Sequence, residues 1–238
     1  SLKASPEKFF ELSKLVKTGS EVEEVIVPTH VELPKEFKPI MGDLDLASKK
    51  AYNYLRKRNI TKDDILKYNL GYCDFGKYAN RIIIPSYDKD GSLNYFTARS
   101  FEKDPFKNYL NPDCSRDIIP FELFINWDSP LILCEGPFDA MAIKRNAIPL
   151  LGKNIQSNLL KKIVQSTVEK IYIALDTDAM KQSLKHCEYL LNQGKEVYLV
   201  ELEGKDPSDL GFSYFTKLIQ NTYPLDEYNL MEKKLSLV

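Results

Sequence analysis

The segment Leu131-Ile-Leu-Cys-Glu135-Gly-Pro-Phe-Asp139-Ala140 is an apolar run that ends in carboxylates. This pattern indicates the fold class. A second segment, Ile171-Tyr-Ile-Ala-Leu-Asp176-Thr-Asp178-Ala179, repeats the pattern. Short continuous apolar runs are typical of strands that are buried on both faces of a parallel sheet. Ligands of open α/β sheets bind at the carboxyl ends of such strands. We therefore expect both sets of carboxylates at one edge of one sheet.

Carboxylates that converge on one place repel one another unless a cation lies between them. Their hard oxygen atoms suit Mg²⁺ or Mn²⁺. An alternative is that acidic residues at strand ends only cap the following helices, and Asp139 in particular fits the first turn of a helix. Because two such segments occur in one chain, the pattern favours a metal site for phosphate chemistry.

Bulk composition is that of an ordinary globular protein of 238 residues, with 43% apolar and 28% charged residues. No apolar stretch approaches the roughly 18 residues that a membrane helix needs, and no charged-then-apolar leader opens the chain, so we expect no membrane contact and a cytoplasmic location. The cysteines are widely spaced, without a Cys-x-x-Cys pair, and the two histidines have no ligand-spaced neighbours. We expect reduced thiols and no zinc in this chain.

Charge is unevenly distributed although the net charge is only −1. Residues 46–108 hold 13 Lys and Arg against 7 Asp and Glu, which predicts a phosphate-binding face beside the acidic site. One basic run is interleaved with Tyr52 and Tyr54 and is a candidate for tracking single-stranded DNA, or alternatively a solvated helix face. Its basic residues are Lys49, Lys50, Arg56, Lys57 and Arg58.

Hydrophobic periodicity and turn residues divide the chain into four parts. We expect an arm or linker over 1–44, with a short helix near 7–17, and a basic, mixed α+β subdomain over 45–128. Strands are predicted over 81–87 and 93–99, joined by an Asp-Gly turn. Residues 129–203 alternate strands (131–134, 148–151, 171–175, 196–201) with helices (138–146, 156–166 and one from Met180 to Gly194). A helix over 208–221 and a polar tail complete the last part, 204–238.

The acidic motifs resemble those of a known family. Glu-Gly-x-x-Asp at 135–139, Asp-x-Asp at 176–178 and Gly204-Lys-Asp206-Pro-Ser-Asp209 resemble the TOPRIM domain of bacterial-type DNA primases, topoisomerases and some nucleases. Upstream, residues 51–72, 80–99 and 107–111 resemble successive motifs of the primase polymerase core alone. The resemblance thus covers roughly residues 46–215, and it points to a bacterial or phage-like primase catalytic core.

This resemblance implies a fold, a reaction and a set of residues. The fold is α/β, with a TOPRIM-type parallel α/β domain preceded by a mixed α+β subdomain. The reaction is template-directed synthesis of short RNA primers with two or more Mg²⁺ or Mn²⁺ ions. Catalytic and metal-binding roles fall on Glu135, Asp176 and Asp178, with Asp139 and Asp206 as further metal ligands. Nucleotide or template binding falls on Asn80, Arg81, Arg99, Lys107 and Asn111.

Implied partners are single-stranded DNA, ribonucleoside triphosphates and a replicative helicase, the last through regions outside this chain. The implied location is the cytoplasm of a bacterial cell or phage-infected host. Two other functions remain open: a TOPRIM-type metal-dependent nuclease and a noncatalytic nucleic-acid-binding module. The basic residues also have structural alternatives, because Arg81, Arg99 and Lys107 can pair with nearby carboxylates, and Asn80 and Asn111 can be turn residues.

The chain departs from the family pattern at a few positions. Asn108 separates Lys107 from the Tyr-Leu-Asn sequence, Ser208 stands where the family has an aspartate, and Asp209 matches the last motif only weakly.

Overall fold

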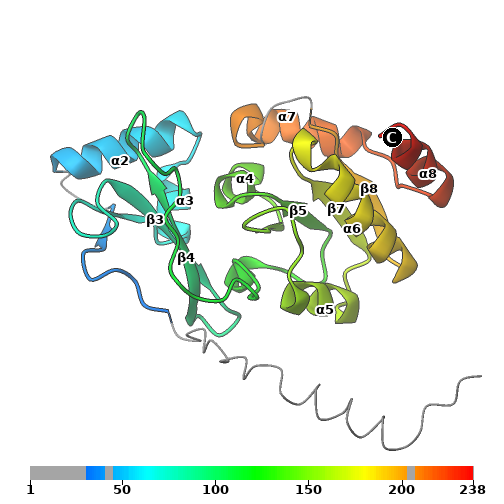
Figure 1. Cartoon of the computed structure of the whole chain (residues 1–238), viewed down its shortest axis with the longest axis horizontal. Helices are drawn as coiled ribbons and strands as arrows, with labels where there is room; N and C mark the ends of the chain where they lie inside the picture. The colour runs from blue at the N-terminus through cyan, green and yellow to red at the C-terminus, as the bar shows by residue number, and fades with distance from the viewer. Residues whose placement is uncertain (1–30, 41–44, 203–206, 238) are drawn as a thin grey trace, which may run out of the picture.

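The computed structural model describes residues 31–40, 45–202 and 207–237; the helix expected near 7–17 lies outside them. Two four-stranded sheets lie side by side in this part of the chain (Figure 1). The first is antiparallel, in the order β1-β2-β3-β4. Its strands are β1 (Lys38–Pro39), β2 (Gly71–Cys73), β3 (Arg81–Tyr87) and β4 (Leu93–Ser100).

The hairpin of β3 and β4 has the predicted Asp-Gly turn. The Oδ1 atom of Asp88 accepts hydrogen bonds from the backbone N–H groups of Asp90 and Ser92, both at 2.9 Å. Gly91 has φ +82°, a conformation that L side chains rarely adopt. The prediction of a hairpin at this position is confirmed.

Helices α2 (Leu46–Lys57) and α3 (Lys62–Lys67) begin at side-chain caps. The carboxylate of Asp45 accepts from the N–H of Ser48 at 2.7 Å, and Thr61 and Asp64 form a reciprocal capping box. Their buried apolar residues join one core with Ile82 and Ile84 of the antiparallel sheet. Both helices therefore pack on this sheet.

The second sheet is parallel, in the order β6-β5-β7-β8. Its strands are β5 (Leu131–Cys134), β6 (Ala147–Pro149), β7 (Lys170–Ala174) and β8 (Glu196–Leu199). The chain runs from β5 outward to β6, returns past β5 to β7, and continues to β8. The order of strands therefore reverses between β5 and β7, and such a switch point opens a crevice at the carboxyl edge of a sheet.

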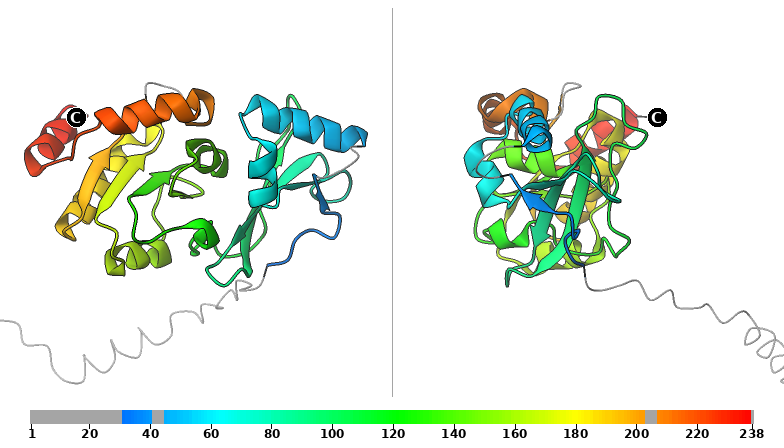
Figure 2. Two further views of the ribbon diagram at one scale, coloured as in Figure 1. Left: turned by 180° about the vertical axis from the view of Figure 1, so that it is seen from behind. Right: turned by 90° about the vertical axis from the view of Figure 1, so that its left-hand side faces the viewer.

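Helices cover both faces of the parallel sheet, as the alternation of its side chains requires. Ile132 and Cys134 pack on one side with α4 (Pro137–Ile143) and α7 (Pro207–Asn221). Leu131 and Leu133 pack on the other side with α5 (Ser157–Gln165) and α6 (Met180–Asn192). Figure 2 shows these layers from behind and end on. Two 3-10 turns, η1 (Glu122–Phe124) and η2 (Thr177–Ala179), lie in the connecting segments.

The structure differs from the sequence-based expectations at both ends of the chain. The strand β1 lies within the predicted linker and pairs with β2, which supplies the backbone partners. An additional helix, α8 (Glu227–Leu235), replaces the predicted polar tail. The sequence conceals α8 because Tyr228, Met231 and Leu235 are exposed, and only Leu230 is buried in the core shared with α6. Gly211, with φ +74°, interrupts α7.

In the described part of the chain, no helix combines the length and the apolar character needed to cross a membrane.

Candidate active site

The acidic motifs meet where the sequence places them, at the carboxyl ends of β5 and β7. These strands are paired in register, with Cys134 opposite Ala174. Glu135 directly follows β5, and Asp176 and Asp178 lie at and inside the turn η2 that follows β7. Each of these carboxylates offers one oxygen within 4.8 Å of the others. We call Glu135, Asp176 and Asp178 the acidic triad.

The chemistry of the acidic triad fits a divalent cation. The Oε2 atom of Glu135 is buried and has no hydrogen-bond partner among the described residues. Burial, followed by the nearby Asp176 carboxylate, raises the pKa of Glu135 to about 7. A cation at this place would satisfy the buried oxygen and remove the repulsion that disfavours ionisation. Carboxylate oxygens are ligands of Mg²⁺ and Mn²⁺.

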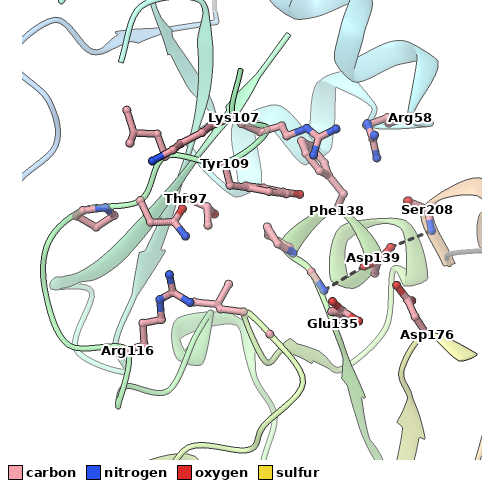
Figure 3. Close-up of a pocket in the computed structure, with 18 residues that line it drawn as sticks. Arg58, Thr97, Lys107, Tyr109, Arg116, Glu135, Phe138, Asp139, Asp176 and Ser208 are labelled. Atoms are coloured by element: carbon pink, nitrogen blue, oxygen red, sulfur yellow. Dashed lines mark hydrogen bonds between the residues drawn. The ribbon is translucent and has the colours of Figure 1, made fainter. Parts of the chain in front are cut away.

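Asp139 has a different environment from the acidic triad. Its Oδ2 accepts from the backbone N–H of Gly136 at 3.0 Å, and its Oδ1 accepts from that of Ser208 at 3.2 Å (Figure 3). The side chain therefore joins the first turn of α4 to the start of α7. The predicted metal role of Asp139 stays a prediction, and Asp206, also predicted as a ligand, lies outside the described residues.

A cleft of about 700 Å³ separates the acidic residues from a basic wall. Figure 3 shows Lys107, Arg58 and Arg116 opposite Glu135, Asp139 and Asp176. Arg99 also lines this cleft, and we call Arg58, Arg99, Lys107 and Arg116 the basic wall. Guanidinium and ammonium groups that face carboxylates across an open cleft suit a phosphorylated ligand carrying its own cations.

Two of the predicted nucleotide-binding residues make local contacts instead of lining the cleft. The guanidinium of Arg81 donates to the carbonyl oxygens of Lys107 at 2.9 Å and Asn108 at 3.1 Å. The amide of Asn80 donates to Glu102 at 2.8 Å, and its φ of +56° in a turn agrees with the alternative that Asn80 is a turn residue. By contrast, Asn111 lines the cleft, and its buried Oδ1 has no hydrogen-bond partner among the described residues.

The basic residues in and after α2 that are predicted to bind single-stranded DNA do not all lie at the cleft. Arg58, just beyond the end of α2, lines the cleft, and its guanidinium lies 5.1 Å from the centre of the Phe138 ring. The other members of the run are exposed to solvent on α2: Lys49, Lys50, Arg56 and Lys57. Their role in binding single strands stays a prediction.

Sequence reasoning did not single out Arg116 and Lys153. Arg116 belongs to the irregular segment between β4 and β5, where no periodic pattern marks it. Lys153 follows β6 and reaches the acidic triad, with its Nζ 2.6 Å from Oδ2 of Asp178. Its position just beyond a strand at the carboxyl edge of the parallel sheet was a usable signal.

Comparisons with known proteins find similarity to Toprim-like domains and to DNA primases. A family model described as Toprim-like matches residues 132–210, which include the acidic triad. A solved DNA primase catalytic domain bound to single-stranded DNA superposes with a TM-score of 0.67 and 18% identity, over 81% of this chain and 77% of the other. The chain has the fold of a DNA primase catalytic core.

Other relatives agree with this fold. The zinc-binding and RNA polymerase domains of Aquifex aeolicus primase match with a TM-score of 0.63 and 24% identity, over 78% of this chain and 60% of that one. Among curated sequences, the DNA primase of Legionella pneumophila is 25% identical over 75% of this chain. An uncharacterized protein of Mycoplasma pneumoniae is 29% identical over 64% of this chain and 76% of its own length. The chain spans between 29% and 45% of the length of the curated primases that it matches.

Proposed function

We propose that this chain is the catalytic core of a DNA primase, a nucleotidyltransferase that joins ribonucleotides into short RNA primers on single-stranded DNA. The observation that carries the proposal is the acidic triad facing the basic wall across one cleft. The primase-like fold around this cleft supports the same function.

In the proposed reaction, the 3′-hydroxyl oxygen of one nucleotide forms a bond to the α-phosphorus of the next. The bond from that phosphorus to the bridging oxygen of pyrophosphate breaks, and the hydroxyl proton passes to solvent. Divalent cations, when bound, would supply charge neutralisation and activation of the hydroxyl. Glu135, Asp176 and Asp178 would hold them.

The remaining residues of the cleft bind and orient the reactants. Arg99 and Lys107 line the cleft and suit the triphosphate, and Arg58 and Arg116 extend the positive surface for phosphates of the template. Tyr109 lines the cleft and is 39% exposed, and the guanidinium carbon of Arg99 lies over its ring, 4.8 Å from the ring centre. This places an aromatic face at the cleft on which a base can stack.

The proposed partners are single-stranded DNA, ribonucleoside triphosphates and, through regions outside this chain, a replicative helicase. With these partners the protein would work in the cytoplasm of a bacterial cell or of a phage-infected host.

A single assay tests the proposal against its alternatives. The purified chain is incubated with a single-stranded template, labelled ribonucleotides and Mg²⁺ or Mn²⁺. Elongated labelled products support the primase, shortened template identifies a nuclease, and DNA binding without either product identifies a noncatalytic module. Loss of synthesis in Glu135→Gln and Asp176→Asn is expected, because these variants keep the shape of the side chain and remove the charge that holds the metal.

The matched control is Glu169→Gln. Glu169 is exposed and directly precedes β7, whereas Asp176 lies beyond the other end of that strand. This variant should keep full activity. Circular dichroism of all variants establishes that folding is retained. Full synthesis by Glu135→Gln would overturn the assignment of the acidic triad.

A further inference from the structure

Lys153 forms an ion pair with one carboxylate of the acidic triad. Its Nζ lies 2.6 Å from Oδ2 of Asp178, on the rim of the site. The side chain of Asp178 is 72% exposed and that of Lys153 is 42% exposed. An ion pair this exposed contributes little to stability, so a stronger ligand of Asp178 can replace the ammonium group.

The backbone around Lys153 is held in a defined place. The N–H of Leu150 bonds to the carbonyl oxygen of Cys134, which ties the loop to β5. Leu151 has φ +56°, an uncommon conformation for a residue with a side chain. His186, on α6, lies with Nε2 2.9 Å from the carbonyl oxygen of Lys153. Contacts with β5 and α6 thus fix the backbone position from which the Lys153 side chain extends.

The same loop forms part of the cleft. Leu151 and Gly152, directly before Lys153, line the cavity together with Glu135 and Asp176. A lysine side chain with a fixed backbone and a rotatable stem can therefore reach either Asp178 or the cleft.

We propose that Lys153 is a tethered counter-ion of the acidic triad: it occupies Asp178 until a divalent cation binds there, and it then contacts the phosphates of a bound nucleotide. The inference rests on the proposed function for the identity of the nucleotide but not for the competition with metal. Competition follows because an ammonium group and a divalent cation repel each other when they share one carboxylate. Once displaced, the ammonium group lies beside the cleft where an anionic ligand binds.

Isothermal titration of Mn²⁺ into the full chain, without nucleotide, tests the competition. We expect Lys153→Met to bind Mn²⁺ several-fold more tightly than the unmodified chain, because the competing cation is gone. Lys161→Met is the matched control: it removes the same charge from an exposed position on α5 and should leave the affinity unchanged. An unchanged or weaker affinity in Lys153→Met would overturn the proposal.

A double-mutant cycle shows whether the effect passes through Asp178. In the Asp178→Asn background, replacing Lys153 by Met should bring no gain in Mn²⁺ affinity. A gain of the same size in both backgrounds would mean that Lys153 acts only as a distant charge, and this too would overturn the proposal.

The second half of the inference is tested with a nucleotide. In saturating Mn²⁺, binding of a non-hydrolysable ribonucleoside triphosphate should be several-fold weaker in Lys153→Met and restored in Lys153→Arg. Equal binding by all three proteins would refute the phosphate contact. Because neither titration measures primer synthesis, an inactive chain with the expected Mn²⁺ result would refute the proposed function and leave the competition supported.

Discussion

The hydroxyl oxygen of Tyr54, on α2, lies 2.9 Å from the Nε atom of Arg99, on β4, and accepts its hydrogen bond. The same oxygen accepts from Nε of Arg58, also at 2.9 Å. One phenol group therefore orients two guanidinium groups of the basic wall. Each guanidinium also lies against an aromatic ring, Arg99 on Tyr109 and Arg58 on Phe138. Both are held in place before any ligand binds.

Tyr54→Phe should therefore weaken substrate binding more than it affects the fold. The substitution keeps the ring and removes both hydrogen bonds. We expect the apparent KM for ribonucleotides to rise several-fold with a smaller change in kcat. The free energy of unfolding should fall by about 1–2 kcal/mol, the usual loss for one or two hydrogen bonds.

Steady-state primer synthesis and urea denaturation measure the two effects. Tyr52→Phe, at a neighbouring position of α2, serves as the control and should change neither. If Tyr54→Phe leaves KM unaltered, the shared hydroxyl is a structural contact without a role in binding.

The raised pKa of Glu135 predicts that metal binding depends on pH. Burial raises this pKa to about 7, so the carboxyl is mostly protonated below pH 7, and a cation must displace the proton. Mn²⁺ affinity should therefore rise with pH, by up to about tenfold per unit below pH 7, and become constant above it. Titration calorimetry between pH 5.5 and 8 measures this dependence, and an affinity that is flat over the range would contradict it.

Glu135 should also make the metal-free protein less stable as pH rises. Its pKa is higher in the folded state than the ordinary value of 4.5, so folding favours the protonated form. The stability of the metal-free fold is then greatest below pH 4.5, as far as this group is concerned, and falls as pH rises through 7. At pH 8, Glu135→Gln should need more urea to unfold than the unmodified metal-free chain, and a lower midpoint would refute the burial of this charge.

Arg81 should affect the stability of the fold directly and the binding of substrate only indirectly. Its hydrogen bonds to the carbonyl oxygens of Lys107 and Asn108 hold the segment that carries Lys107 into the basic wall. Arg81→Ala should lower the free energy of unfolding by about 1.5–3 kcal/mol, the range for hydrogen bonds of charged groups. KM should rise indirectly through Lys107.

Lys89→Ala is the control for loss of a positive charge, because Lys89 is exposed in the β3–β4 turn. It should change neither the urea midpoint nor KM. A stable Arg81→Ala variant with a raised KM would show instead that Arg81 contacts phosphate directly.

Binding of single-stranded DNA should be weak and strongly salt-dependent. Each phosphate contact contributes a slope of about −0.7 to the plot of log affinity against log salt concentration. Arg116→Ala should therefore reduce the slope by about 0.7, whereas Lys161→Ala on α5 should leave it unchanged. Fluorescence anisotropy of a labelled oligonucleotide over a salt series measures both, and a salt-independent affinity would exclude an electrostatic groove.

The parallel sheet and the acidic triad could be predicted from the sequence because they follow from local rules. A short apolar run favours a buried strand, and the carboxyl ends of parallel strands meet at one edge. Glu135 and Asp176 could be placed at one edge of one sheet once their strands were recognised, and the pairing of β5 with β7 makes them neighbours. The Asp-Gly hairpin could be predicted in the same way, because it depends on a few consecutive residues.

Only the tertiary structure decided how the basic residues are used. Tyr54 and Arg99 are 45 positions apart, and Lys153 and Asp178 are 25 apart. Tyr54 and Arg99 meet because α2 packs on the antiparallel sheet, and Lys153 and Asp178 meet because β6 and β7 lie on the two sides of β5. No local pattern encodes either relationship. For the same reason the sequence could not separate Arg58, which faces the cleft, from Arg56 and Lys57, which face solvent: a run of charges shows where cations occur, whereas packing decides which of them a ligand can reach.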